Sequence, residues 1–303
     1  MTVTPQLSEE VEAALRHGRA VVALETTLVS HGFPGAQGVQ VALAAEARVR
    51  QAGAVPATIG IMDGAVRAGL TPAELERFAS AGPEARKAGP RDLAACVVQG
   101  ALGATTVGGT LAVCRLAGIG FMATGGTGGV HRRFAESLDI SADLPQIART
   151  RALVVSSGVK SILDVPATAE LLETLGVPVL GWRTGTLPLF YSAAGGPPVS
   201  AVVTAAKEAA LIIAAHWQLN GSTGVLLTRP PEPSLEIEPV IAEAVATVES
   251  QGVRGQSVTP AVLALVHELT GGRSAEVNRQ LIEDNAGLAA EVAVAYSAAA
   301  ADG

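Results

Sequence analysis

The chain contains few residues that could act as a nucleophilic amine. Of its 21 basic residues only three are lysines, Lys87, Lys160 and Lys207. Lysine, unlike arginine, can lose its proton when it is desolvated and can then attack a carbonyl carbon to form a Schiff base. Lys160 follows an apolar run that ends in Ser156-Ser157-Gly158, and ligands gather at the carboxyl ends of strands in open α/β sheets. The pattern favours Lys160 over Lys87 as the reactive amine. Retention of Lys160 by chance is the alternative. Lys207, beside Glu208, is typical of a solvated helix face.

Three carboxylates stand at positions that suit chemistry. Glu25 directly follows an apolar run, where burial could raise its pKa toward the range of a general acid; a solvated or capping role stays open. Asp139 and Asp143 are four residues apart, on one side of a helix or of a strand. Two like charges held close need a proton or a cation between them. With no Cys or His cluster nearby, the spacing predicts Mg²⁺ or Mn²⁺. The alternative is that Asp143 only caps the helix expected from residue 144, which would still allow Asp139 to bind the ion.

A glycine-rich segment, TGGTGGVHR at residues 124–132, follows another expected strand. Its glycines would let backbone N–H groups approach a ligand closely, and His131 and Arg132 would add donors or positive charge. We therefore expect an anion-binding loop here, with a merely tight turn as the alternative.

The elements that must position these residues alternate between apolar strands and amphipathic helices. Continuous apolar runs are typical of strands buried on both faces, so we expect a three-layer α/β/α fold with a central mixed sheet, built as one domain over residues 1–303. Thr71-Pro72-Ala73-Glu74 predicts a helix start with a capping box. Further helices are expected over 8–16 and 36–52 and from Thr259 and Ser274, and strands over 20–24, 57–62, 104–107, 118–123, 153–156, 177–181 and 225–228.

Composition excludes several classes of function. Hydrophobic residues make up 49% of the 303 residues and charged residues 16%, which is unlike a disordered chain. The longest uncharged runs are broken by glycines, prolines and threonines, so no membrane span is expected. A net charge of −7 and 3% aromatic residues argue against nucleic-acid binding. Two cysteines and the absence of a signal-peptide pattern lead us to expect a cytoplasmic protein.

The candidate site residues considered above lie within a set of nine longer segments, which are VALETTLVSHGFP at 22–34, QAGAVPATIGI at 51–61, RKAGPRDL at 86–93, GATTVGGT at 103–110, ATGGTGGVHR at 123–132, LDISADL at 138–144, SSGVKSILD at 156–164, ELTGG at 268–272 and NRQLIEDNA at 278–286. In order and over almost the whole chain, these segments resemble the family of pseudouridine-5′-phosphate glycosidases and indigoidine synthase A-like proteins. The resemblance implies a reversible, metal-dependent C–C glycosidase that converts pseudouridine 5′-phosphate into uracil and ribose 5-phosphate, assembled as a homotrimer with one Mn²⁺ per subunit or another divalent ion.

The resemblance also implies roles for individual residues. Lys160 looks like the nucleophile that forms an imine with C1′ of the ring-opened sugar, Glu25 like the proton donor and acceptor, and Asp139 like the metal ligand. The expected substrate-binding residues are Lys87, Val107, Thr124, His131, Ser141, Ala142, Asp143 and Asn285.

This sequence departs from the family pattern in places. It has Asp284-Asn285 where the family has two asparagines, Pro230-Pro231-Glu232-Pro233 where the family has Pro-x-Pro-Glu, and a poorly matching segment over 195–204. These departures concern base and phosphate contacts.

Two alternative functions stay open. One is a related enzyme of pigment biosynthesis that acts on another ribosyl phosphate, and the other is a catalytically silent sugar-phosphate-binding protein.

Overall fold

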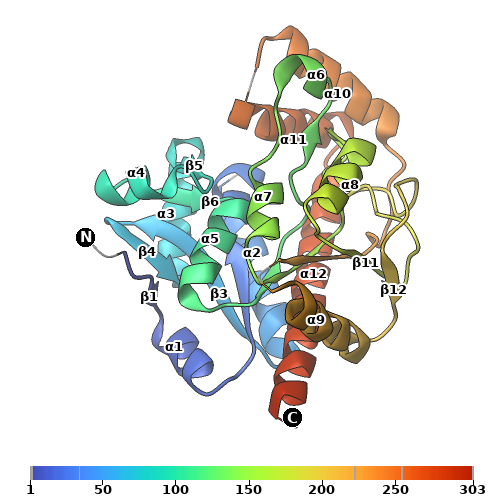
Figure 1. The fold of residues 1–303 in the computed structure, drawn as a ribbon. Helices are drawn as coiled ribbons and strands as arrows, with labels where there is room; N and C mark the ends of the chain where they lie inside the picture. The colour runs from blue at the N-terminus through green and yellow to red at the C-terminus, as the bar shows by residue number, and fades with distance from the viewer. Residues whose placement is uncertain (1–2, 34, 222, 254, 302–303) are drawn as a thin grey trace.

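The computed structural model describes residues 3–33, 35–221, 223–253 and 255–301, and it shows helices on both sides of one large central sheet (Figure 1). Within the described residues, 11 strands belong to this sheet, with a main path in the order β1-β4-β3-β2-β7-β9-β13-β11-β12. The predicted three-layer α/β/α class with a mixed sheet is confirmed. The strands of the path are β1 (Gln6–Leu7), β2 (Val21–Glu25), β3 (Val55–Met62), β4 (Ala65–Ala68), β7 (Phe121–Ala123), β9 (Leu153–Ser156), β11 (Val179–Trp182), β12 (Ala201–Val203) and β13 (Val225–Thr228), and β5 (Arg86–Ala88) and β6 (Gly103–Thr105) lie off it.

The central strands are parallel, and this brings their carboxyl ends to one edge of the sheet. β2 pairs in parallel with β3 and β7, β7 with β9, and β9 with β13. Every residue of β2, β3, β9 and β13 is buried, as continuous apolar runs require. β3 is antiparallel to β4 and to β6, which makes the sheet mixed.

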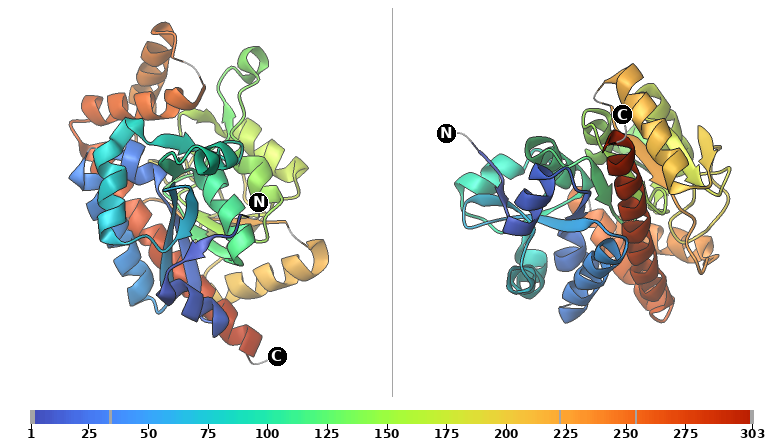
Figure 2. Two further views of the ribbon diagram at one scale, coloured as in Figure 1. Left: turned by 90° about the vertical axis from the view of Figure 1, so that its left-hand side faces the viewer. Right: turned by 90° about the horizontal axis from the view of Figure 1, so that it is seen from below.

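Helices pack on both faces of this sheet. In Figure 1, α5 (Val107–Ala117) and α7 (Asp143–Ala148) lie in front of the strands and the long α12 (Arg273–Ala301) runs behind them. α12 packs against α2 (Ala36–Gln51), α9 (Ala206–Asn220) and strands β2, β7 and β9, and Figure 2 shows its length along the molecule. The other α-helices are α1 (Glu9–Arg16), α3 (Pro72–Ala81), α4 (Leu93–Val98), α6 (Phe134–Ser137), α8 (Val165–Thr174), α10 (Glu238–Ser250) and α11 (Val258–Leu269).

Local signals fixed some boundaries well and misplaced others. The capping box is present: Thr71 Oγ1 accepts from the Glu74 amide, and Glu74 accepts from the Thr71 amide. The strand predicted over 104–107 ends earlier, because Thr106 is the N-cap of α5 and Val107 is the first helical residue. The strand predicted over 118–123 begins later, because Gly118 takes a left-handed conformation that ends α5.

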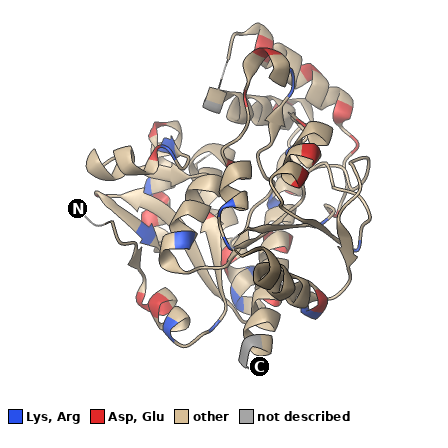
Figure 3. Cartoon of the chain, in the orientation of Figure 1, with Lys and Arg blue, Asp and Glu red and all other residues tan. Residues whose placement is uncertain are grey.

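Lys and Arg are interspersed with Asp and Glu along the ribbon (Figure 3). Many of them form ion pairs, for example Arg229 with Asp284 at 2.9 Å and Arg77 with Asp63 at 2.9 Å. Lys207 is exposed, as its neighbourhood in the sequence predicted. Among the described residues, no helix combines the length and apolar character needed to cross a bilayer.

Candidate active site

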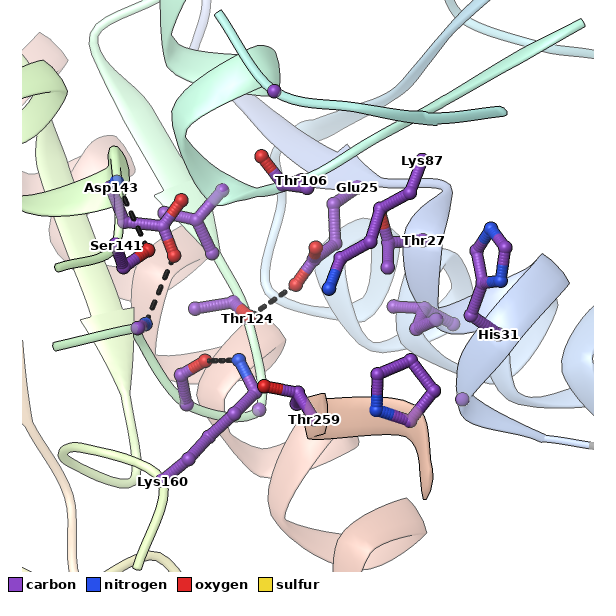
Figure 4. A pocket seen from close by; sticks show the side chains of 18 of the residues that line it. Glu25, Thr27, His31, Lys87, Thr106, Thr124, Ser141, Asp143, Lys160 and Thr259 are labelled. Atoms are coloured by element: carbon purple, nitrogen blue, oxygen red, sulfur yellow. Dashed lines mark hydrogen bonds between the residues drawn. The ribbon is translucent and has the colours of Figure 1, made fainter. Parts of the chain in front are cut away.

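A cavity of about 350 Å³ lies at the carboxyl ends of β2, β7 and β9 (Figure 4). Glu25 is the last residue of β2, Thr124 follows β7, and the turn after β9 carries Lys160. A π-helical turn (Leu28–Gly32) and α11 contribute further wall residues. The parallel sheet therefore brings residues more than 100 positions apart in the sequence to one cavity. All of the residues predicted for the site, except Asn285, line it.

Glu25 is held as a buried carboxyl group. Its side chain accepts a hydrogen bond from Thr124 Oγ1. Burial raises the pKa of Glu25, and the charge of Asp143 raises it further, while the charges of Lys160 and Lys87 and the bond from Thr124 act in the opposite direction. A carboxyl group with a raised pKa can hold a proton at higher pH than an exposed one, which is what a general acid needs.

Lys160 enters the cavity from a turn that is tied to the glycine-rich segment. Gly158, with φ of 85°, lies in the left-handed region, and a Cβ there would come within 2.0 Å of the Pro188 carbonyl oxygen. The Lys160 amide donates to Thr127 O at 3.2 Å, and its Nζ donates to Gly126 O. The half-buried amine is thus directed into the cavity.

Lys87, which lies on β5, approaches the carboxyl group of Glu25. Figure 4 shows its amine pointing toward Glu25. Burial lowers the pKa of Lys87, and the charge of Lys160 lowers it further, whereas the carboxylates of Asp143, Glu25 and Asp139 raise it. The site thus brings together two amines and several carboxylates, and burial shifts the pKa values of Glu25 and Lys87, as is common at functional sites.

Asp143 does not act as a helix cap, so that alternative is wrong. It is the first residue of α7, and its carboxylate accepts from the amides of Gly108 (2.7 Å) and Gly128 (2.9 Å). Because these amides come from the start of α5 and from the glycine-rich segment, Asp143 joins two walls of the cavity. Val107, Ser141 and Ala142 lie beside it.

Asp139, the predicted metal ligand, lines the same cavity as Asp143. Its side chain is 34% exposed, and its Oδ2 lies 3.8 Å from Nδ1 of His131. Within the described ranges no cluster of three or more His, Cys, Asp or Glu side chains is arranged to hold an ion. Mg²⁺ and similar hard ions usually keep several water ligands and need only one or two carboxylates. A single, partly exposed carboxylate such as that of Asp139 would suit an ion of this kind.

In the glycine-rich segment, several of the backbone amides that we predicted to bind an anion are bonded within the protein, and anion binding by the segment stays a prediction. The amides of Thr124 and Thr127 donate to Val155 O and Gly158 O, and that of Gly128 donates to Asp143. The glycines of the segment have no positive φ, so they do not form a nest of alternating conformation. They are small for packing reasons: a Cβ on Gly126 would lie 2.5 Å from Phe190, and one on Gly128 would lie 2.2 Å from Ser141 Oγ.

The asparagine of α12 that lines the cavity is Asn278, and the predicted Asn285 does not line it. Asn285 is fully buried and lies outside the cavity wall, bonded to Thr124, Gly125 and Ser157. Asn278 lines the cavity and was not singled out, although it opens the segment NRQLIEDNA. Asp284, the departure from the family pattern, pairs with Arg229 and does not line the cavity.

Sequence reasoning also missed the walls formed by His31, Phe33 and Leu263. Nothing in their local patterns marks them as site residues, because the π-helical turn and α11 meet only in the folded chain.

A buried acid and a lysine amine that converge at the carboxyl ends of parallel strands define an α/β enzyme with an acid–amine pocket. The family model described as "Indigoidine synthase A like protein" matches residues 10–295, and the chain belongs to this family. Proteins named pseudouridine-5′-phosphate glycosidase are similar over nearly their full length. That of Chloroflexus aurantiacus is 48% identical (96% of this chain, 98% of that protein), and that of Escherichia coli K12 is 45% identical (96% and 95%).

A solved structure shares the whole fold. The prealnumycin C-glycosynthase AlnA, crystallised in complex with ribulose 5-phosphate, superposes with a TM-score of 0.91 at 41% identity, over 100% of both chains.

Proposed function

We propose that this chain cleaves pseudouridine 5′-phosphate reversibly into uracil and ribose 5-phosphate, through an imine between Lys160 and C1′ of the ring-opened sugar. The observation that carries the proposal is the placement of the Lys160 amine and the buried Glu25 carboxyl in one cavity. The names of relatives at 45–48% identity support the substrate.

The chemistry explains why both groups are needed. A C–C glycosidic bond offers no leaving oxygen that a simple acid could protonate. When the Lys160 amine bonds to C1′ and the C1′–O4′ bond breaks, O4′ takes up the proton that the amine loses. The nitrogen lone pair can then form the C=N bond as the C1′–C5 bond breaks. The electron pair of the C1′–C5 bond remains on C5 of uracil. In this proposal Glu25 delivers the proton that C5 requires. Water then hydrolyses the imine, which frees Lys160 and ribose 5-phosphate.

The remaining polar wall suits the sugar phosphate. Lys87 and His131 supply a cation and a ring nitrogen for the 5′-phosphate, and charge-assisted bonds of this kind contribute about 1.5–3 kcal/mol each. We propose that Asp139 holds one Mn²⁺, or Mg²⁺, which would supply positive charge to oxygens of the bound substrate. This chain's own residues then bind the phosphate, form the imine and move the proton.

Incubation of the purified protein with pseudouridine 5′-phosphate and Mn²⁺ tests the proposal. Free uracil should appear, and borohydride added during turnover should leave a reduced ribose phosphate adduct on the peptide that contains Lys160. Tight binding of ribose 5-phosphate without uracil release would point instead to a silent sugar-phosphate-binding protein.

A second candidate is the joining of a sugar phosphate to a different carbon nucleophile, as the name of AlnA, a C-glycosynthase, suggests for that protein. The acid–amine pair would serve both reactions, so only the base-side wall would differ. The higher identity of the glycosidase relatives favours the first candidate. A competition experiment in the synthetic direction separates the two candidates. With ribose 5-phosphate in excess, it compares the rate at which uracil is joined to the sugar with the rates for other aromatic carbon nucleophiles.

We also propose that the protein works in the cytoplasm as a homotrimer. Both cysteines, Cys96 and Cys114, are free and buried, as suits a reducing compartment. Large apolar side chains are exposed on β12 and α9, including Val202 and Leu219, and an exposed apolar surface favours a partner. Light scattering should give three times the chain mass of 30.5 kDa.

A further inference from the structure

Asn285 joins the two loops that carry the reacting groups, although it does not line the cavity. It lies on α12, which packs against β7 and β9, and its side chain is fully buried. One loop follows β7 and contains Thr124 and Gly125; the other follows β9 and contains Ser157. A single side chain thus contacts both loops at the point where each leaves the sheet.

The hydrogen bonds are specific for an amide. Asn285 Nδ2 donates to Thr124 O at 2.9 Å, with a longer contact to Gly125 O at 3.4 Å and one to Ser157 Oγ at 3.1 Å. Its Oδ1 lies 3.5 Å from Ser157 Oγ. Because the carbonyl oxygens can only accept, a donor is required at this position, and a carboxylate cannot replace the amide.

Each loop held in this way leads directly to a reacting group. The residue whose carbonyl Asn285 binds, Thr124, donates through its own hydroxyl to Glu25. The loops are also bonded to each other, by Ser157 N to Gly125 O at 2.9 Å and by Lys160 Nζ to Gly126 O. The acid and the nucleophile therefore share one buried anchor.

We propose that Asn285 is a positioning residue, which fixes the Glu25 carboxyl and the Lys160 amine relative to each other through Thr124 and Ser157. This inference rests on the proposed function. Loss of the amide should slow the reaction, because a group displaced by even 1 Å reacts much more slowly, while substrate contacts at the phosphate end remain.

The test compares Asn285→Asp and Asn285→Ala with Ser274→Ala. Ser274 is also buried on α12, and it bonds Thr270 and Tyr191 instead of the two loops, so its variant reports the cost of losing buried hydrogen bonds on the same helix. For both Asn285 variants we expect kcat to fall tenfold or more, KM for pseudouridine 5′-phosphate to change less than threefold, and borohydride trapping at Lys160 to slow. Ser274→Ala should keep kcat within twofold.

A pH profile separates positioning from loss of stability. Without the Asn285 amide, Thr124 should no longer hold its hydroxyl against Glu25. The bond from Thr124 favours the ionised form of Glu25, so its loss should raise the pKa of Glu25. Lys160, Lys87 and Asp143 still face that carboxyl group in the variants. Because the protonated acid is the active form in cleavage, the alkaline fall in kcat should move to higher pH in the Asn285 variants. A change in stability alone would leave the profile in place.

Ser157→Ala provides a milder variant in case the Asn285 variants do not fold. It removes one partner of the amide and should lower kcat severalfold without changing KM. An active parent whose Asn285 and Ser157 variants keep the parental kcat and pH profile would overturn the inference alone. A parent that releases no uracil would overturn the proposed function, and this inference with it.

Discussion

Replacing Glu25 by glutamine separates proton transfer from shape, because the two side chains have the same length. The glutamine carbonyl oxygen can still accept the hydrogen bond that Thr124 Oγ1 donates to Glu25. The variant can no longer give or take a proton at C5 of uracil. We therefore expect substrate affinity to persist while the chemical step slows.

The magnitude follows from the role assigned to the acid. General acid–base catalysis contributes about 10²–10⁴-fold, so kcat should fall by about that factor, equivalent to about 2.7–5.4 kcal/mol at about 1.36 kcal/mol per tenfold. KM should change less than about threefold, because the contacts to the phosphate lie on other residues. Uracil release, measured as initial rates over a range of substrate concentrations, gives both quantities.

The same variant should alter the pH dependence of stability. Burial raises the pKa of Glu25 above its ordinary value of 4.5, so the folded chain binds this proton more tightly than the unfolded chain. The resulting stabilisation is complete below pH 4.5 and is lost as pH rises through the folded pKa. Glutamine does not titrate. The Tm of the variant relative to the parent should therefore increase as pH rises over this interval.

A contrary result would be equally clear. If Glu25→Gln weakened binding of ribose 5-phosphate tenfold and left kcat unchanged, Glu25 would be an anchor for substrate, and the acid would have to be another group of the cavity. A Tm difference that is constant with pH would show that the carboxyl has an ordinary pKa in the folded chain.

Three further variants test the other parts of the site. Lys160→Ala should abolish uracil release and borohydride labelling, and mass spectrometry that finds the label on another lysine would exclude Lys160 as the nucleophile. Asp139→Ala should remove the stimulation by Mn²⁺ with an unchanged Tm, and full activity of the parent after exhaustive chelation would contradict a metal requirement. Gly128→Ala places a Cβ 2.2 Å from Ser141 Oγ, so urea denaturation should show about 1–3 kcal/mol less stability and kcat/KM should fall at least tenfold. Gly185→Ala, which meets no atom within 4 Å, is the matched control and should change neither.

The sequence alone determined the fold class and the order of the elements. Apolar runs such as 20–24 and 153–156 could be predicted as strands, because a strand buried on both faces is apolar along its length. Such a run is visible in the local sequence. The capping box at Thr71 was equally readable, because all of its bonds join residues within one turn of helix. The scarcity of lysine and the position of Glu25 at a strand end marked two of the groups that the cavity brings together.

Only the tertiary structure decided how those groups are held. The partners of Asp143 are amides 35 and 15 residues away, and those of Asn285 are more than 120 residues away, so no local pattern distinguishes a cap or a ligand contact from a bond between loops. The glycines at 125–129 read as an anion-binding loop in the sequence. In the folded chain they are small because neighbouring side chains leave no room for a Cβ. Residue type and spacing record what a segment can do, whereas the contacts that select among those roles form only when parallel strands bring distant segments to one edge of the sheet.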